Sequence, residues 1–254
     1  MSVVETPRAR YRQVAEELRN AIKRGEYQPG EMLPSQPELA RKYGLNQTSI
    51  NRAIALLRAE GLVRVEHGRG AFVQLVPTVK RTRRVPRPGG NGSSFADEMR
   101  KAGLDPRTEL VSLRTDPAPV GVAERLGLDE GGPVVVRERH MFASERPVQL
   151  AISYIPLTVA GSEDIAVPDV GPTGLYKRLA ERGYVVTRFV EEIESRRAHP
   201  NEAGFLGLTD AQQVLEVARV VFAGEQPVET VVNVFPAQQW RLSYEWNAEG
   251  AGLT

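Results

Sequence analysis

A duplication at an offset of 80 residues constrains the fold of the C-terminal part of this chain more than any other feature. The segment LGLDEGGPVVVRERHMFASERPVQ, from Leu126, aligns without a gap with LGLTDAQQVLEVARVVFAGEQPVE, from Leu206. Each copy reads helix, strand, short helix and two hairpin strands, and the stretches 147–155 and 227–235 alternate as half-buried antiparallel strands do. The repeat predicts two halves related by a pseudo-twofold axis that share one central sheet, an arrangement in which ligands commonly bind between the halves.

The charge of the chain is divided unevenly along its 254 residues, a length that suits two modest domains. Residues 1–92 carry 17 Lys and Arg against 8 Asp and Glu, whereas the remainder carries 16 and 24. This asymmetry indicates that the first part meets a polyanion, although a chance excess of arginine on solvated faces would give the same count.

Composition excludes several classes of protein. The chain has no cysteine, which excludes disulfides and thiolate metal sites or nucleophiles. The N-terminus lacks the apolar core of a signal peptide, and no later apolar run is long enough to span a membrane. We therefore expect a cytoplasmic protein with no membrane partner.

The N-terminal part has the pattern of a helix-turn-helix. Apolar residues at helical spacing predict a helix over 11–22, and Ser35 is a natural N-cap for a short second helix that ends at Gly44. A third helix begins near Gln47 after a short turn and ends before Gly61, with a polar N-terminal face. Two helices joined by such a turn are typical of DNA-binding proteins.

The following segment, LVRVEHGRGAFVQL, predicts a wing. It reads as two short alternating strands around a glycine-rich tip, His67-Gly68-Arg69-Gly70. Glycines let the tip approach a phosphate backbone, and Arg69 can enter a minor groove or pair with phosphate.

Residues 10–76 resemble the DNA-binding domain of the GntR family of bacterial regulators. The resemblance is carried by YRQVAEELRNAIKRGEYQPGEMLPS, ELARKYGL and AIALLRAEGLVRVEHGRGAFV, and it implies a winged helix-turn-helix domain over 1–76. The chain departs from the family at Gln36, where glutamate is usual, at Asn46-Gln47, where Ser-Arg is usual, and at Asn51, which replaces a frequent arginine.

These departures suggest an unusual operator. Arginine suits the guanine edge, whereas Gln and Asn suit adenine N6 and N7, so Gln47 and Asn51 would favour A·T pairs. Contacts to phosphate or water alone are the alternative. The residues expected at double-stranded DNA are Ser35, Gln36, Gln47, Thr48, Asn51, Arg52, His67, Gly68 and Arg69.

Residues 77–92 read as a basic, flexible linker, because Pro and Gly interrupt them. Near DNA their cations would add salt-dependent affinity, but they would equally keep an exposed linker soluble. The cations are Lys80, Arg81, Arg83, Arg84 and Arg87.

Residues 93–247 resemble the UTRA domain, the effector module of the HutC subfamily of GntR regulators, on VVVRERHMFASERPVQLAISYIP, RRAHPNEAGFLGL and PVETVVNVFPAQQWRLSYEW. Residues 248–254 remain as a tail. The resemblance implies an α+β, chorismate-lyase-like fold that binds small polar or anionic metabolites between sheet and helices. It places Arg139 at the first arginine of the family's strand motif. A second arginine and an acid found in sugar-phosphate binders fall on Met141 and Ala151, which argues against assuming a sugar phosphate.

Other polar residues complete the expected effector site. Ser93 or Ser94 lies at the start of a helix, where free N–H groups suit an anion. Arg219, the repeat mate of Arg139, either faces the ligand or pairs with an acidic side chain. The full set expected at the effector is Ser93, Ser94, Arg139, Gln149, Ser153, Glu192 and Tyr244.

The sequence thus predicts a homodimeric repressor that a small-molecule effector releases from a pseudo-palindromic operator. An alternative is an effector-independent regulator, for example of a plasmid or mobile element, whose C-terminal domain only dimerises. We expect no enzyme, no cofactor and no metal, because no nucleophile–base pair, HExxH motif or phosphate-binding glycine loop is present.

Overall fold

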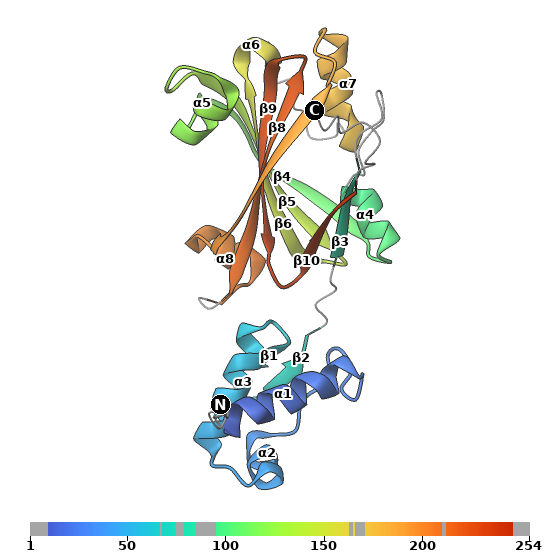
Figure 1. The fold of residues 1–254 in the computed structure, drawn as a ribbon, viewed down its shortest axis with the longest axis vertical. Coiled ribbons are helices and arrows are strands. Elements are labelled where there is room, and N and C mark those ends of the chain that lie inside the picture. The colour runs from blue at the N-terminus through green and yellow to red at the C-terminus, as the bar shows by residue number, and fades with distance from the viewer. Residues whose placement is uncertain are drawn as a thin grey trace, which may run out of the picture. The chain divides into compact units, whose positions relative to one another are not determined.

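The computed structural model describes residues 10–66, 68–74, 79–84, 95–162, 165, 171–209 and 212–245. The chain forms two compact units, Met1–Pro77 and Thr78–Thr254 (Figure 1). The first unit contains α1 (Arg10–Lys23), α2 (Gln36–Tyr43), α3 (Gln47–Ala59), β1 (Val63–Glu66) and β2 (Gly70–Val73).

The helices of the first unit begin where the sequence provides capping groups. The backbone N–H and the hydroxyl of Ser35 both donate to the Glu38 carboxylate, at 2.8 and 2.7 Å, which fixes the start of α2. The Asn46 side chain accepts a hydrogen bond from the Ser49 N–H at 2.9 Å and caps α3. Gly44 ends α2 with a left-handed φ of 58°, which glycine adopts without steric cost.

One hydrophobic core joins the three helices to the wing. The strands β1 and β2 pair antiparallel from Val63↔Val73 to Glu66↔Gly70, as expected for a wing. Val63 and Val73 pack with the buried faces of all three helices, so the wing is anchored to the helix-turn-helix. The predicted winged helix-turn-helix is confirmed.

The second unit is built on a six-stranded sheet of order β4-β5-β6-β9-β8-β7 (Figure 1). Neighbouring strands are antiparallel throughout. The strands are β4 (Pro106–Pro117), β5 (Pro133–Ala143), β6 (Arg146–Pro156), β7 (Arg188–Arg197), β8 (Gln213–Ala223) and β9 (Gln226–Pro236).

The predicted pseudo-twofold axis passes through the middle of this sheet. On the two central strands, Ile152 of β6 pairs with Val232 of β9, its own repeat mate 80 residues later. The β5–β6 hairpin has a register shift after Met141, and the β8–β9 hairpin has the same shift after Val221. The duplication is therefore visible both in the strand order and in the irregularities of the two hairpins.

The helices of the two halves cover opposite faces of the sheet (Figure 1). On one face, α5 (Val120–Leu126) packs on Val134 and Val136, and α8 (Pro200–Leu206) packs on Val214 and Val234. The other face carries α4 (Phe95–Lys101), α7 (Gly171–Glu181) and the short α6 (Leu157–Ala160), with two further hydrophobic clusters beneath them.

Part of the predicted linker is a strand. Residues Val79–Arg84 form β3, which pairs in parallel with β10 (Trp240–Glu245) beside α4. Val79 is 1% exposed and belongs to the core beneath α4, and Arg81 is 4% exposed. The prediction of a flexible connection is wrong for these residues, because long-range partners outweigh their basic composition. Arg87 lies outside the described residues.

Candidate DNA interface and effector site

The predicted DNA-facing side of α3 is exposed. Its apolar stripe, formed by Ile50, Ala53, Ile54 and Leu57, is buried in the core of the first unit. Gln47, Thr48, Asn51 and Arg52 lie on the opposite, exposed side. A helix with one buried stripe and a row of small polar side chains facing solvent can enter a major groove and present those side chains to base edges.

Gln47 and Gln36 link the starts of α3 and α2. The Gln47 Nε2 donates to Gln36 Oε1 at 3.3 Å, and both side chains are on the exposed side of the unit. Ser35, one residue before, already uses its hydroxyl as a donor to Glu38. The two glutamines that distinguish this chain from the usual family pattern therefore contact each other, and each keeps further amide donors and acceptors for DNA.

The wing tip exposes a cation on a glycine-rich turn. Arg69 has a side chain that is 71% exposed and forms an ion pair with Glu66. Its guanidinium also lies over the Phe72 ring, 5.4 Å from the centroid. Gly68 and Gly70 have φ values of 74° and 124°, which side chains rarely adopt. His67 lies outside the described residues.

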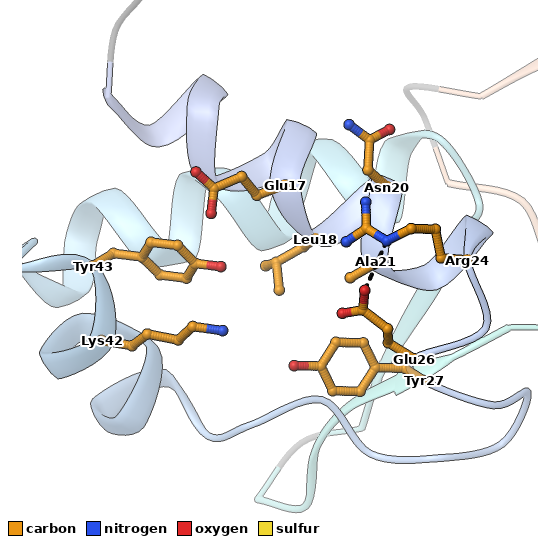
Figure 2. A pocket seen from close by; sticks show the side chains of 9 residues that line it. All are labelled: Glu17, Leu18, Asn20, Ala21, Arg24, Glu26, Tyr27, Lys42 and Tyr43. Atoms are coloured by element: carbon orange, nitrogen blue, oxygen red, sulfur yellow. Dashed lines mark hydrogen bonds and ion pairs between the residues drawn. The ribbon is translucent and has the colours of Figure 1, made fainter.

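A cavity of about 330 Å³ in the first unit is separate from the predicted DNA-facing residues (Figure 2). Burial raises the pKa of Tyr43, one of its lining residues, to about 12, so the phenol is neutral at physiological pH. No residue of α3 or of the wing lines this cavity. Its lining consists of Glu17, Leu18, Asn20, Ala21, Arg24, Glu26, Tyr27, Lys42 and Tyr43.

In the second unit, cross-strand pairing brings polar residues into rows on one face of the sheet. Residues directly opposite each other on antiparallel strands share a face. One row runs from Arg137 through Ser153 and Val231 to Arg219 and Glu191. The neighbouring row contains Arg139, Ala151, Asn233 and Val217.

Arg139 and Arg137 form the cationic centre of this face. Arg139 Nη2 donates to the Ser153 hydroxyl at 3.1 Å, and its Nε has no hydrogen-bond partner among the described residues. Burial lowers the pKa of Arg139, and burial together with the neighbouring Arg139 lowers the pKa of Arg137 to about 10. Both arginines would gain from an added negative charge, because their charged forms are held against a desolvation cost.

A buried carboxylate lies beside the two arginines. Glu229 is 2% exposed, and its Oε2 has no hydrogen-bond partner within the described part of the chain. It favours the charged forms of both Arg137 and Arg139. Burial and Glu229 raise the pKa of the Tyr176 hydroxyl, which therefore stays protonated and able to donate.

The remaining charges of this face are paired. Arg219 donates to Glu191 Oε1 through Nη2 and Nε at 2.5 and 2.7 Å. The Tyr244 hydroxyl donates to Glu191 Oε2 at 2.9 Å, although the tyrosine itself is 40% exposed. Of the two roles left open for Arg219, the structure favours that of a partner for an acidic side chain.

A second network attaches β3 to the same face. Arg81 Nε donates to Glu98 Oε2 at 2.6 Å, and its Nη2 donates to Gln149 Oε1 at 3.1 Å. Gln149 Nε2 in turn donates to Asn233 Oδ1 at 2.8 Å. The Arg81 guanidinium also lies over the ring of Trp240, 4.8 Å from its centroid. Gln149 is thus fully engaged in linking β3 to the sheet.

The prediction that Glu192 faces the effector site is wrong. Glu192 pairs with Ala218 on the opposite face of the sheet, and its carboxylate accepts a hydrogen bond from Arg125 of α5 at 3.3 Å. Its neighbour Glu191 lies on the face of Arg139, because successive residues of a strand point to opposite faces. Ser153 and Gln149 do share that face with Arg139, whereas Ser93 and Ser94 lie outside the described residues.

Sequence reasoning missed Arg137, Glu229, Tyr176 and Glu191. Two of them carried a usable signal. Arg137 is two residues before Arg139 and must share its strand face, and Glu229 is the repeat mate of Gln149. Tyr176 and Glu191 come from α7 and β7, whose placement against the sheet depends on tertiary packing.

Two searches of the described part of the chain gave negative results. No helix there is long and apolar enough to cross a membrane. Within the same residues, no group of three or more His, Cys, Asp or Glu side chains is arranged to hold a metal ion.

Comparisons with known proteins match both units. The UTRA domain family matches residues 101–241, more than half of the chain, and the bacterial regulatory proteins of the gntR family match residues 10–73. An uncharacterised HTH-type transcriptional regulator of Rhizobium meliloti is 30% identical over 93% of this chain and 95% of its own length.

Two relatives with more specific names and one solved structure agree with these matches. The HTH-type transcriptional repressor NagR of Bacillus subtilis is 26% identical over 86% of each chain. The histidine utilization repressor of Pseudomonas putida is 26% identical over 94% of this chain and 92% of its own. The fold resembles the crystal structure of PhnF from Mycobacterium smegmatis, at 22% identity and a TM-score of 0.56 over 92% of this chain and 99% of PhnF.

The exposed recognition helix, the anchored wing and the duplicated sheet thus coincide with two family matches that together span most of the chain. The names of the relatives are those of DNA-binding regulators and not of enzymes. The chain belongs to the GntR family of transcriptional regulators and, through its UTRA effector domain, to the HutC type within that family.

Proposed function

We propose that this regulator is a cytoplasmic homodimeric repressor that leaves its operator when an anionic metabolite binds beside Arg139. The observation that carries the proposal is the buried cluster of Arg139, Arg137 and Glu229, in which Arg139 Nε and Glu229 Oε2 have no hydrogen-bond partner among the described residues. Unsatisfied buried polar atoms are costly in a folded protein, and a ligand that pairs with them would offset that cost.

Repression is supported by the relatives. NagR and the histidine utilization repressor are both named as repressors, and they match nearly the whole chain. In a dimer, two recognition helices would enter successive major grooves of a pseudo-palindromic operator. An effector that changes the placement of the two DNA-binding units would weaken this fit, and the operator would weaken effector binding by the same factor.

On the DNA, we propose that Gln47 and Asn51 read base edges while Thr48, Arg52 and the wing contact the backbone. Gln36 supports Gln47 through their hydrogen bond. Amide side chains pair with adenine in two hydrogen bonds, so the operator should carry A·T pairs where they lie.

The decisive experiment combines operator selection with metabolite release. Full-length protein would select its operator from random DNA, and a metabolite library would then be screened for compounds that reduce operator binding. We expect release by an anion in the wild type and its loss in Arg139→Ala, with Glu194→Gln as a control on the opposite face. Operator binding that ignores every compound, together with no thermal shift from any of them, would support the effector-independent alternative.

A further inference from the structure

We propose that the effector is a monoanion, in particular a monocarboxylate that also carries a hydroxyl or neutral N–H donor, and that Glu229 makes the site reject dianions. This inference rests on the proposed function, since it assigns the charge class of the ligand that binds beside Arg139. It follows from the balance of charges on one face of the sheet.

Two ion pairs on this face cancel. Arg219 and Glu191 are joined by hydrogen bonds of 2.5 and 2.7 Å, with side chains 16% and 10% exposed. Arg81 and Glu98 are joined at 2.6 Å, with side chains 5% and 4% exposed. Each pair is neutral as a whole and needs no ligand charge.

Three charges remain at the centre of the face within the described residues. Arg137 is directly opposite Ser153, which accepts a hydrogen bond from Arg139, and Glu229 acts on both guanidinium groups. Two cations and one carboxylate leave a surplus of one positive charge. The residues directly around them, Ala151, Val231 and Asn233, are uncharged.

A surplus of one charge selects among ligands because isolated charges are strongly disfavoured in a buried site. One negative charge on the ligand makes the cluster neutral. A dianion would place an unbalanced negative charge beside the Glu229 carboxylate, and a neutral ligand would leave the arginine charge unbalanced. The lowered pKa values of Arg137 and Arg139 agree with cations that lack sufficient compensation before the ligand binds.

The unpartnered oxygen of Glu229 adds a second requirement. An ionised carboxylate only accepts hydrogen bonds, so Oε2 calls for a donor on the ligand. A ligand that offers an anionic group to Arg139 and a hydroxyl or N–H to Glu229 would satisfy both partnerless atoms at once.

Three probes of the same size class test the charge rule on full-length protein by isothermal titration calorimetry. Glycerol, glycerate and glycerol 3-phosphate share hydroxyl groups and differ in charge, since a phosphate monoester is mostly dianionic at pH 7.5. At matched ionic strength, we expect glycerate to bind at least about tenfold more tightly than either of the others, the size of effect typical of close charge pairs.

Substitution of Glu229 should reverse this order. Glu229→Gln leaves a surplus of two positive charges, so glycerol 3-phosphate should bind more tightly than glycerate. Glu194→Gln makes the same charge change on an exposed residue of the opposite face and should leave the order as in the wild type. If Glu229→Gln does not fold, Arg137→Met provides the second test, because it removes the surplus and should abolish the preference for glycerate over glycerol.

The outcomes separate the inference from the proposed function. A wild type that prefers glycerol 3-phosphate, or an order unchanged in Glu229→Gln, would overturn the monoanion rule while leaving an anion site at Arg139. Glycerate binding that is unchanged in Arg139→Ala, or absent altogether, would overturn the site itself and the inference with it.

Discussion

At the scale of single residues, the interface with DNA rests on amide side chains where the family usually has arginine. Gln47 and Asn51 are exposed on the same side of α3, and Gln47 contacts Gln36. Their exposure could be predicted from the sequence, because the apolar stripe of α3 defines the opposite side. Their mutual contact could not, since it depends on how two helices pack.

Gln47→Arg should change which base pair the protein prefers. Arginine pairs with guanine O6 and N7, so the selected operator should gain a G·C pair in each half-site, with discrimination of about 1–3 kcal/mol at that position. Binding-site selection on the wild type and the variant measures this directly. Thr48→Ser, a small change on the same exposed side, is the control, and a consensus that stays the same in Gln47→Arg would show that Gln47 does not read a base.

The start of α8 depends on one carboxylate. Glu202 accepts hydrogen bonds from Arg196 Nη1 and Nη2 and from the His199 N–H, at 2.7, 2.7 and 2.8 Å. Burial raises the pKa of Glu202, but Arg196 and the His199 amide outweigh it and lower the pKa below its usual value. Because the folded-state pKa is lowered, the stabilisation is present above the unfolded-state pKa and is lost as pH falls through the folded-state pKa.

Glu202→Gln should therefore destabilise the protein in a pH-dependent way. We expect a loss of about 2–3 kcal/mol at pH 7, the range for hydrogen bonds to charged groups, and a smaller difference from the wild type at pH 3. Urea unfolding at the two pH values measures the free energies. An equal loss at both would contradict an ionised Glu202 as the anchor of α8.

At the scale of elements, most of the fold follows from local patterns, and the exceptions have physical reasons. The duplicated sheet, the wing and the helix caps all depend on periodicity and turn residues that the sequence displays. The strand β3 is different, because its residues pair with β10 and Glu98, more than 15 positions away. The same limit explains Glu192 and Glu191, since a one-residue difference decides which face of the sheet a side chain meets.

The attachment of β3 should depend on the charge pair between Arg81 and Glu98. Arg81→Met leaves a buried carboxylate without its cation and should cost about 3–5 kcal/mol of unfolding free energy. The double variant Arg81→Met with Glu98→Leu removes both charges and should recover most of that loss. Urea unfolding of the wild type, the two single variants and the double variant gives the coupling, and purely additive losses would contradict a buried ion pair as the attachment.

At the scale of the whole molecule, the uneven charge of the chain matches the division of labour between its units. The basic excess lies in the part that contains α3 and the wing, where a protein that binds phosphates needs it. The charges of the second unit are mostly paired with one another, and the described exception is the cluster of Arg137, Arg139 and Glu229. The structure thus gives each unit a distinct ligand class, DNA for the first and an anion for the second.

The claim that joins the two units is that Arg139 makes operator binding responsive to the effector. The most direct test measures operator affinity of full-length wild type and Arg139→Ala while a compound that releases the wild type is titrated. We predict that Arg139→Ala binds the operator as tightly as the wild type without the compound and is released only at concentrations at least about tenfold higher, a typical allosteric coupling. Release of both proteins at the same concentration would contradict the account.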